Sequence, residues 1–475
     1  MSLFSDEDYN FANSLGISAS ALDQQWKRLT SGFKRIELAK AATIGDGIRK
    51  LSAFENKKYA GIFDQEGTNY KIIKFVPASG AASRMFLPFR EMIEDPFSDQ
   101  SELLISSLSK FPFYNALVAK TNEKGLKIKD LISDPKKLAD FIIGAEGLDY
   151  DKAPKGLIPF SANEKEVLNA FEMHLEEAKQ ISDSYIHFTV AEDFLVKIKS
   201  GLNEERAEYS IQDPSTHFIS MHDNEPVRDE SGKLIFWPSG HGSLLKNLNE
   251  LDSDIVFIKN IDNIQIPSKN TISIEVKKIL GGYLIDLKQT IDLFLFQLEE
   301  DPEVDLEEIK NWIKNTLDPS FDLSNKNDLI TYLHRPIRIA GMVLNEGKAG
   351  GGPFWIKSES DIGLQIVEGA QIDKSDPIQN AILASSTHFN PVDMVCSIID
   401  HRGVKYDLEE YLDKEAGFLT KKQVNGYDAI IMERPGLWNG SMASWLSVFI
   451  EIPLSSFTPV KDVLDLLPTE KEQLS

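Results

Sequence analysis

Residues 70–84 have the sequence Tyr70-Lys71-Ile72-Ile73-Lys74-Phe75-Val76-Pro77-Ala78-Ser79-Gly80-Ala81-Ala82-Ser83-Arg84. The first seven are mostly apolar and β-branched or aromatic, which predicts a short buried strand that ends at Pro77. The small side chains that follow predict a tight loop whose backbone N–H groups can approach an anion, with the Arg84 guanidinium as a further donor. Ligands of open α/β sheets collect outside the carboxyl ends of the strands, so this loop is the first candidate site. A tight turn beside an exposed arginine explains the same residues without any ligand.

Further strands are expected where short segments are apolar and rich in β-branched or aromatic residues. They lie at residues 185–190, 207–212, 255–258, 362–367, 394–399 and 444–452. Helical patterns separate them, and the clearest of these patterns predicts a helix from Ser161 through Leu175. Alternating strands and helices favour an α/β fold, with a mainly parallel sheet covered by helices on both faces.

Charge and cysteine content exclude several classes of function. With 74 acidic against 51 basic side chains, the net charge of −23 argues against a nucleic-acid partner, because Lys and Arg hold a phosphate backbone. Cys396 is the only cysteine, so neither an intrachain disulfide nor a Cys-based zinc site is possible. The N-terminus lacks a signal-peptide pattern, and the most apolar stretch, residues 279–298, contains charged residues. We therefore expect a cytoplasmic protein without a membrane partner.

Two later segments carry further motifs. The first is Pro154-Lys155-Gly156-Leu157-Ile158-Pro159-Phe160, in which Lys155 alone would usually be a solvated charge. The second begins with Phe236-Trp237-Pro238-Ser239-Gly240-His241-Gly242-Ser243 and continues to the strand Ile255-Val256-Phe257-Ile258-Lys259, which is followed by Asn260-Ile261-Asp262-Asn263. Gly240 and Gly242 leave room for a base or ribose, and Asp262 at a strand end offers Mg²⁺ a hard oxygen ligand.

In this order the three segments resemble nucleotidyltransferases that make NDP-sugars, and UDP-sugar pyrophosphorylases in particular. The whole chain also resembles an uncharacterised bacterial domain-of-unknown-function family that carries the same segments. The resemblance implies a GT-A-like, Rossmann-related fold in which the loop amides and Arg84 hold a nucleoside triphosphate. It also implies that Lys155 neutralises phosphate charge during transfer, so Arg84 and Lys155 are the expected catalytic residues.

The resemblance assigns the remaining site residues by their positions in the motifs. Nucleotide binding is expected at Ala78, Ser79, Gly80, Ala81, Ala82, Ser83, Gln212, Gly240, His241 and Gly242. Sugar or phosphate binding is expected at Asn260, Arg335, Arg338, Lys348, Glu368 and Asn390. Asp262 and Asp393 are the expected ligands of a Mg²⁺ cofactor. Flexible surface loops and common turns explain the residues after Arg335 equally well.

Four regions are expected along the chain. Residues 1–56 form an N-terminal helical region, with a helix over 18–56, and residues 57–300 form the nucleotide-binding α/β core with a helical insertion near 90–150. Bridging helices follow over 301–333, and a C-terminal α/β part over 334–475 completes the substrate site.

The sequence departs from the resembled family in its first loop. Ser79 and Ala82 stand where that family has glycine, and alanine is sterically costly at positive φ. The loop is therefore expected to follow a different path or to hold fewer phosphate oxygens. The roughly seventy residues between Arg84 and Lys155 are an insertion that could form a lid or a partner surface.

The sequence thus predicts a nucleotidyltransferase that joins a nucleoside triphosphate, with UTP favoured, to a sugar-1-phosphate and releases pyrophosphate. A GT-A glycosyltransferase that uses an NDP-sugar, or a non-catalytic nucleotide- or sugar-binding protein, remains an alternative. The oligomeric state is not predicted. Apart from His241, the histidines lack metal-ligand spacing, so no histidine-based zinc site is expected; they are His174, His187, His217, His222, His334, His388 and His401.

Overall fold

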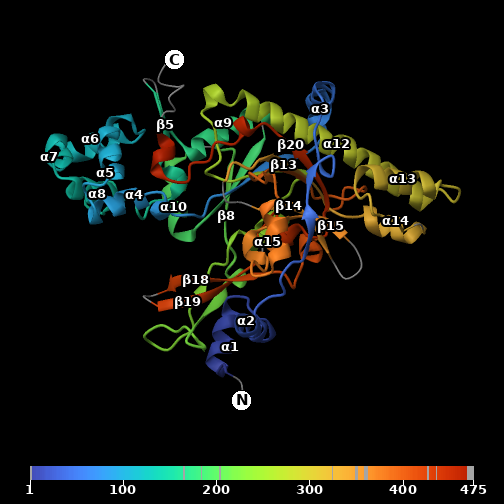
Figure 1. Cartoon of the computed structure of the whole chain (residues 1–475), viewed down its shortest axis with the longest axis horizontal. Coiled ribbons are helices and arrows are strands. Elements are labelled where there is room, and N and C mark those ends of the chain that lie inside the picture. Colours follow the sequence, from blue (N-terminus) through green and yellow to red (C-terminus); the bar gives the residue numbers. More distant parts are fainter. Residues whose placement is uncertain are drawn as a thin grey trace. The chain divides into compact units, whose positions relative to one another are not determined.

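A computed structural model describes residues 3–163, 166–182, 184–202, 205–323, 325–347, 351–357, 362–424, 427–434 and 436–467 (Figure 1). The chain forms two compact units. Unit 1 comprises residues 1–75, 212–258 and 275–454, and unit 2 comprises residues 76–211, 259–274 and 455–475.

Unit 1 contains most of the strands. Its helices are α1 (Asp6–Ser14), α2 (Ala19–Ser31), α3 (Ala53–Glu66), α11 (Leu245–Glu250), most of α12 (Thr271–Glu300), α13 (Leu306–Thr316), α14 (Lys326–Leu333) and α15 (Pro377–Ala384). Its strands are β1 (Leu38–Ala41), β2 (Thr43–Ile44), β3 (Gly47–Arg49), most of β4 (Ile72–Pro77), β9 (Phe218–His222), β10 (Glu225–Pro226), β11 (Phe236–Trp237), most of β12 (Ile255–Lys259), β13 (Ile337–Leu344), β14 (Gly352–Lys357), β15 (Ile362–Val367), β16 (His388–Phe389), β17 (Asp393–Ser397), β18 (Phe418–Val424), β19 (Tyr427–Glu433) and β20 (Leu446–Glu451).

The main sheet of unit 1 has the strand order β2-β3-β20-β13-β17-β12-β4. It is mixed, because β13 runs parallel to β20 but antiparallel to β17, while β12 and β4 are parallel. All five residues of β12 are buried, as expected for a strand covered on both faces. Two smaller antiparallel sheets have the orders β1-β14-β15 and β10-β9-β19-β18. The predicted α/β class is confirmed, and the predicted strands are found as β4, β7, β8, β12, β15, β17 and β20.

The predicted helix over residues 18–56 is only partly right. Helix α2 ends at Ser31, because Gly32 has a φ of 75° that interrupts the helical backbone. Residues 38–49 instead form β1, β2 and β3; β1 pairs with β14, β2 with β3, and β3 with β20. In Figure 1, α1 and α2 lie beside the β18–β19 hairpin, where their apolar residues share a core with β9 and β19.

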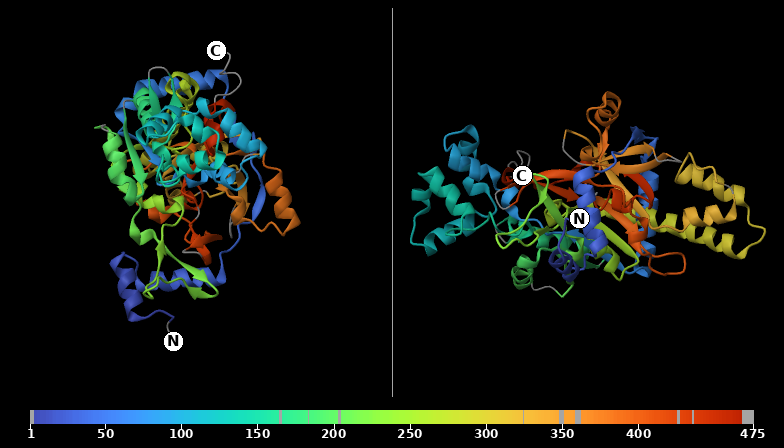
Figure 2. Two further views of the ribbon diagram at one scale, coloured as in Figure 1. Left: turned by 90° about the vertical axis from the view of Figure 1, so that its left-hand side faces the viewer. Right: turned by 90° about the horizontal axis from the view of Figure 1, so that it is seen from below.

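Unit 2 contains a group of helices, an antiparallel pair of strands and a parallel pair of strands. Its helices are α4 (Leu87–Glu94), α5 (Asp99–Ser106), α6 (Tyr114–Glu123), α7 (Ile128–Ile132), α8 (Pro135–Ile143), α9 (Ala170–Ser182) and α10 (Glu192–Gly201). Its strands are β5 (Pro159–Ala162), β6 (Val167–Asn169), β7 (Tyr185–Val190) and β8 (Ala207–Ile211). Helices α4 to α8 gather together (Figure 2) around an aromatic core to which Phe86, Phe89 and Phe113 contribute.

The helix predicted from Ser161 begins later. Residues 159–162 and 167–169 pair as an antiparallel hairpin, β5 and β6, and α9 begins at Ala170. Among the described helices, none combines the length and the apolar composition that a bilayer crossing requires.

Candidate functional site

In the loop after β4, some backbone N–H groups form hydrogen bonds and others do not. The N–H of Ala78 donates to the carbonyl of Thr189 on β7 at 2.8 Å, and that of Ala82 donates to Ala153 at 2.9 Å. The N–H groups of Ser79, Gly80, Ala81 and Ser83 make no hydrogen bond within the described part of the chain. None of residues 78–84 has a positive φ, so Ala82 is accommodated without strain. The loop therefore follows a path open to alanine and offers four amides to an anion.

Lys155 and Asp262 meet in unit 2. The Lys155 ammonium donates to Asp262 Oδ2 at 2.7 Å, and the two side chains are only 14% and 13% exposed. The backbone places Lys155 beside the first loop, because its N–H donates to the carbonyl of Gly80 at 3.0 Å and Pro154 pairs with Ala81. Two motifs separated by about seventy residues in the chain are thus adjacent in space.

Lys461 is a third member of this cluster that the sequence did not indicate. Its ammonium donates to the same Asp262 oxygen at 3.0 Å. The contact follows from the C-terminal segment, in which the N–H of Val460 donates to the Asp262 carbonyl at 2.8 Å. Arg84 is exposed, and within the described residues it forms no hydrogen bond or ion pair. Two cations therefore share the Asp262 carboxylate, and the charge of Arg84 acts on Lys155. Arg84, Lys155, Asp262 and Lys461 together form the basic cluster.

The pKa values reflect this excess of positive charge. Burial lowers the pKa of Lys155; Asp262 opposes this shift, and the charges of Lys461 and Arg84 add to it. Burial alone would raise the pKa of Asp262, but the charges and hydrogen bonds of Lys461 and Lys155 hold it below its usual value. Asp262 therefore stays ionised, and Lys155 sits among like charges that an anion would relieve.

Asp262 also has the donor chemistry expected for Mg²⁺. Its Oδ1 atom is buried and forms no hydrogen bond within the described structure, so one hard oxygen remains for a cation. Asn260 closes the turn that presents this carboxylate, because its carbonyl accepts the Asn263 N–H at 3.0 Å.

Asp393, the other expected metal ligand, has a different environment. Both of its oxygens accept hydrogen bonds from the Lys277 ammonium, at 3.1 and 3.0 Å, and both side chains are fully buried in unit 1. This geometry suits an ammonium ion rather than Mg²⁺. Asn390 forms part of the same turn, because its Oδ1 accepts the N–H of Val392 at 3.0 Å. Val392 itself has a φ of 58°, a strained conformation for a β-branched residue.

The Gly240-His241-Gly242 segment lies in unit 1. The His241 ring stacks on Trp438 with centroids 4.1 Å apart, and its Nδ1 accepts the N–H of Leu437 at 3.0 Å. Burial lowers the pKa of His241 to about 4, with Glu433 opposing the shift, so the ring is neutral at pH 7. Gln212 supports the segment by donating from Nε2 to the carbonyl of Ser239 at 3.1 Å.

Glu368 lies close to this histidine. Its Oε1 is 3.8 Å from His241 Nε2 and accepts a hydrogen bond from Asn439 at 2.6 Å. Burial raises the pKa of Glu368, Asn439 opposes that shift, and Glu433 adds to it. Glu368, an expected sugar- or phosphate-binding residue, therefore lies beside the Gly240–Gly242 segment within unit 1.

The two arginines of the later half differ in access. Arg338 is fully buried, and its guanidinium donates to Ser447, Gln365 and the Trp438 carbonyl; burial lowers its pKa to about 10. Arg335 instead lines a cavity of about 730 Å³ in unit 1, where its guanidinium lies over the Tyr332 ring. An incoming anion could reach Arg335 but not Arg338. Lys348 lies outside the described residues.

The expected site residues are therefore divided between the units. Unit 2 brings together the loop of residues 78–84, Lys155, Asn260 and Asp262. Unit 1 holds Gln212, residues 240–242, Arg335, Arg338, Glu368, Asn390 and Asp393.

Comparison with protein families gives one match over nearly the whole chain. The model of the family described as "Domain of unknown function (DUF4301)" matches residues 5–472. This match confirms the expected membership of an uncharacterised domain family. A search of curated proteins finds no match.

The solved structures that are similar to this chain include the following three. The UDP-glucose phosphorylase of Trypanosoma brucei is 12% identical, with 97% of this chain and 76% of that chain covered and a TM-score of 0.48. The UDP-N-acetylglucosamine pyrophosphorylase of Trypanosoma brucei is 12% identical, with coverage of 98% and 82% and a TM-score of 0.47. The UDP-glucose pyrophosphorylase of Leishmania major is 10% identical, with coverage of 98% and 78% and a TM-score of 0.46.

Proposed function

The chain belongs to the DUF4301 family, and because the description of that family states no activity, we propose a function from the chemistry of the basic cluster. The proposed activity is a nucleotidyltransferase that forms a UDP-sugar from UTP and a sugar-1-phosphate and releases pyrophosphate.

The observation that carries this proposal is the pairing of Lys155 and Lys461 with the single carboxylate of Asp262, with the charge of Arg84 acting on Lys155. In a chain with a net charge of −23, a local excess of two positive charges favours a polyanionic ligand. The four unbonded amides of the adjacent loop add donors suited to phosphate oxygens. A neutral ligand would not require this concentration of cations.

The reaction needs no nucleophile from the protein. An oxygen of the sugar-1-phosphate forms a bond to the α-phosphorus of UTP, and the bond from that phosphorus to the bridging oxygen breaks. Pyrophosphate leaves with the electron pair of the broken bond. The protein must align two polyanions and stabilise the charge that builds up on the phosphoryl oxygens. Arg84 and Lys155 are proposed for this role, and Lys461 is proposed as their partner.

Mg²⁺, when bound, would neutralise phosphate charge and orient the triphosphate. The buried Oδ1 of Asp262 is the atom proposed to hold it, while Oδ2 remains the acceptor of the two lysines. A triphosphate that enters would compete with Asp262 for these ammonium groups. Because its oxygens replace the carboxylate as acceptors, separating Lys155 from Asp262 would cost less free energy.

A pyrophosphate-release assay with UTP, Mg²⁺ and a panel of hexose-1-phosphates tests the proposal. We expect pyrophosphate only when both substrates are present. Lys155→Met should lower kcat by roughly 10²- to 10³-fold, the usual cost of one transition-state contact. Lys152→Met is the matched control, because Lys152 is exposed near Lys155 in the sequence and forms no hydrogen bond or ion pair within the described structure. This variant should retain full activity.

Other outcomes of this assay would contradict the proposal. Release of UDP from a UDP-sugar, without pyrophosphate from UTP, would indicate a glycosyltransferase. UTP binding without turnover on any sugar-1-phosphate would indicate a binding protein. Equal loss of activity in the Lys152 and Lys155 variants would remove the basic cluster from the mechanism.

A further inference from the structure

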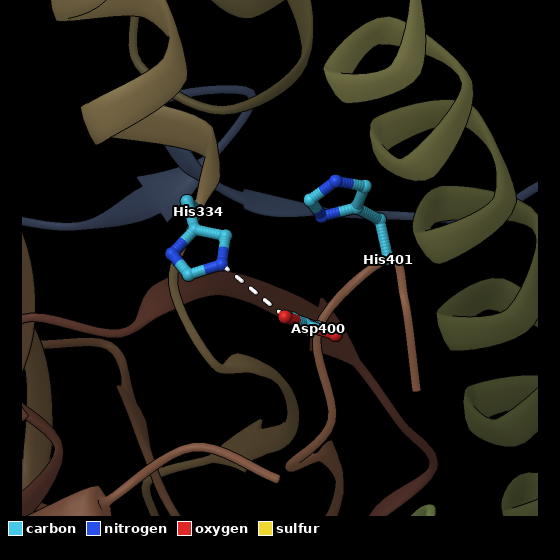
Figure 3. Close-up of side chains that lie close together, drawn as sticks. All are labelled: His334, Asp400 and His401. Carbon is cyan, nitrogen blue, oxygen red and sulfur yellow. Dashed lines mark ion pairs between the residues drawn. The ribbon is translucent and has the colours of Figure 1, made fainter. Parts of the chain in front are cut away.

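A different cluster in unit 1 contains three groups that commonly bind metal ions. His334 follows the C-terminal end of α14, and Asp400 and His401 lie in the turn that follows β17. One ligand atom from each residue lies within 4.8 Å of the other two. Figure 3 shows the three side chains converging, with His334 Nε2 directed at Asp400 Oδ2, 3.5 Å away. Their separation in sequence explains why spacing did not indicate the cluster.

The Asp400 carboxylate is already oriented. Its Oδ1 accepts the N–H groups of Arg402 and Val404, both at 2.8 Å. The turn that supplies these amides passes through Gly403, whose φ of 77° favours glycine. Oδ2 is thereby left facing His334, so the carboxylate does not need to rotate to meet a cation.

His401 provides a second, independent observation. The residue is only 8% exposed, and its Nε2 lies 3.0 Å from Glu299 Oε2 on α12. Its Nδ1 is buried and forms no hydrogen bond within the described chain. In Figure 3, Nδ1 is on the side of the ring that faces Asp400. A buried ring nitrogen without a partner loses its hydration and gains nothing in return, unless a ligand occupies the position in front of it.

The donor set selects a class of ion. Two imidazole nitrogens and one carboxylate oxygen suit Zn²⁺ and similar transition-metal ions, whereas Mg²⁺ and Ca²⁺ prefer oxygen ligands alone. A histidine that binds a metal through one nitrogen usually donates its other N–H to a carboxylate, and Glu299 is placed to accept it. We propose that His334, Asp400 and His401 bind one divalent transition-metal ion of the zinc class.

Nearby cations do not occupy this position. Lys288 donates to the Asp400 carbonyl at 3.1 Å but is ion-paired with Asp292 at 2.8 Å. Arg402 is paired with Glu299 at 2.6 Å. Zinc ligands at the usual bond lengths lie about 3.3 Å apart, so closure around the ion requires side-chain movement of roughly 1–1.5 Å. His334, whose side chain is 39% exposed, provides this freedom and a route of entry.

The bound ion would join three elements of unit 1. His334 connects it to the end of α14, Asp400 and His401 connect it to the turn after β17, and Glu299 extends the connection to α12. An ion held only by the folded state stabilises that state, so its binding should raise the thermal unfolding temperature.

The test uses the full-length chain after dialysis against EDTA, with Zn²⁺ as the probe in calorimetric titration and thermal unfolding. We expect one tight equivalent of Zn²⁺, a higher unfolding temperature, and no competition from excess Mg²⁺. His334→Ala and Asp400→Asn should each weaken binding at least tenfold and remove the thermal shift. Co²⁺ should give the visible bands of a low-coordinate site, and both variants should abolish them.

His222→Ala is the matched control. His222 Nε2 lies 3.4 Å from Asp223 Oδ2 and its side chain is 35% exposed, so this histidine resembles His334 in exposure and in its acidic neighbour. The His222→Ala variant should bind Zn²⁺ as tightly as the unmodified chain does. Because His334 is half-exposed, its replacement tests the site even if variants of buried His401 fail to fold. Absence of a tight Zn²⁺ equivalent, displacement of Zn²⁺ by Mg²⁺, or equal binding by the His334 and His222 variants would overturn the proposal.

Discussion

The ion pair between Lys155 and Asp262 should make a measurable contribution to stability, independent of any activity. At 2.7 Å and an effective dielectric constant of 20, the raw attraction is about 6 kcal/mol, but desolvation of both groups cancels most of it. Asp262→Asn leaves a buried ammonium beside two other cations and should cost about 3 kcal/mol. Lys155→Met should cost only about 1 kcal/mol, because Asp262 keeps Lys461 as a partner.

A double-mutant cycle isolates the pair. The double variant should lose about 2 kcal/mol less unfolding free energy than the sum of the two single losses. The reason is that Asp262→Asn leaves no unpaired Lys155 ammonium when Lys155 has also been replaced. Equilibrium urea unfolding followed by circular dichroism gives the four free energies. A parallel cycle with Lys152→Met in place of Lys155→Met should give a coupling near zero. Equal couplings in the two cycles, or a value below about 0.5 kcal/mol for Lys155, would refute the assigned geometry.

Two further predictions concern unit 1. Hydrogen bonds from Arg228 hold the pKa of Asp8 at about 2, so the stability from this pair is complete above about pH 5 and is lost as pH falls toward 2. Between pH 6 and pH 3, the free energy of unfolding from urea titrations should fall by about 1 kcal/mol more in the unmodified chain than in Asp8→Asn, and parallel curves would contradict the pairing. Asp393→Asn should cost about 3 kcal/mol at every Mg²⁺ concentration, because it leaves the Lys277 ammonium buried and unpaired. A stable variant that has lost its response to Mg²⁺ would instead favour Asp393 as a metal ligand.

Local sequence patterns were sufficient to predict the strands that are buried along nearly their whole length. The apolar runs that became β4, β7 and β12 are buried along nearly their whole length, and their pattern predicted them directly. The strands β1 and β3 were missed because their pairing partners, β14 and β20, lie about three hundred or more residues away. Helical periodicity within such a segment competes with long-range pairing, and the pairing prevailed here.

The site residues also divide into those that a local motif indicates and those that depend on contacts between distant parts of the chain. Arg84, Lys155 and Asp262 each lie in a recognisable motif, and the structure brings the segments that contain these motifs together. Lys461 lies in a polar C-terminal segment with no motif, and its role depends on the backbone contact between Val460 and Asp262. His334 and His401 lack metal-ligand spacing in the sequence, yet the fold places a ligand atom of each within 4.8 Å of a shared carboxylate.

The balance of charge in the basic cluster has a consequence for stability. A chain optimised for stability alone would pair each buried cation with its own carboxylate, and this chain has 74 acidic residues from which to draw partners. Instead, Lys155 shares one carboxylate with Lys461 and lies close enough to Arg84 for repulsion to lower its pKa. Such an arrangement is unfavourable in the absence of an anion, and perturbed groups of this kind concentrate at functional sites. Adding inorganic pyrophosphate should therefore raise the unfolding temperature of the unmodified chain, and this gain should be smaller in Lys155→Met than in Lys152→Met. An identical gain in the two variants would show that the anion binds elsewhere.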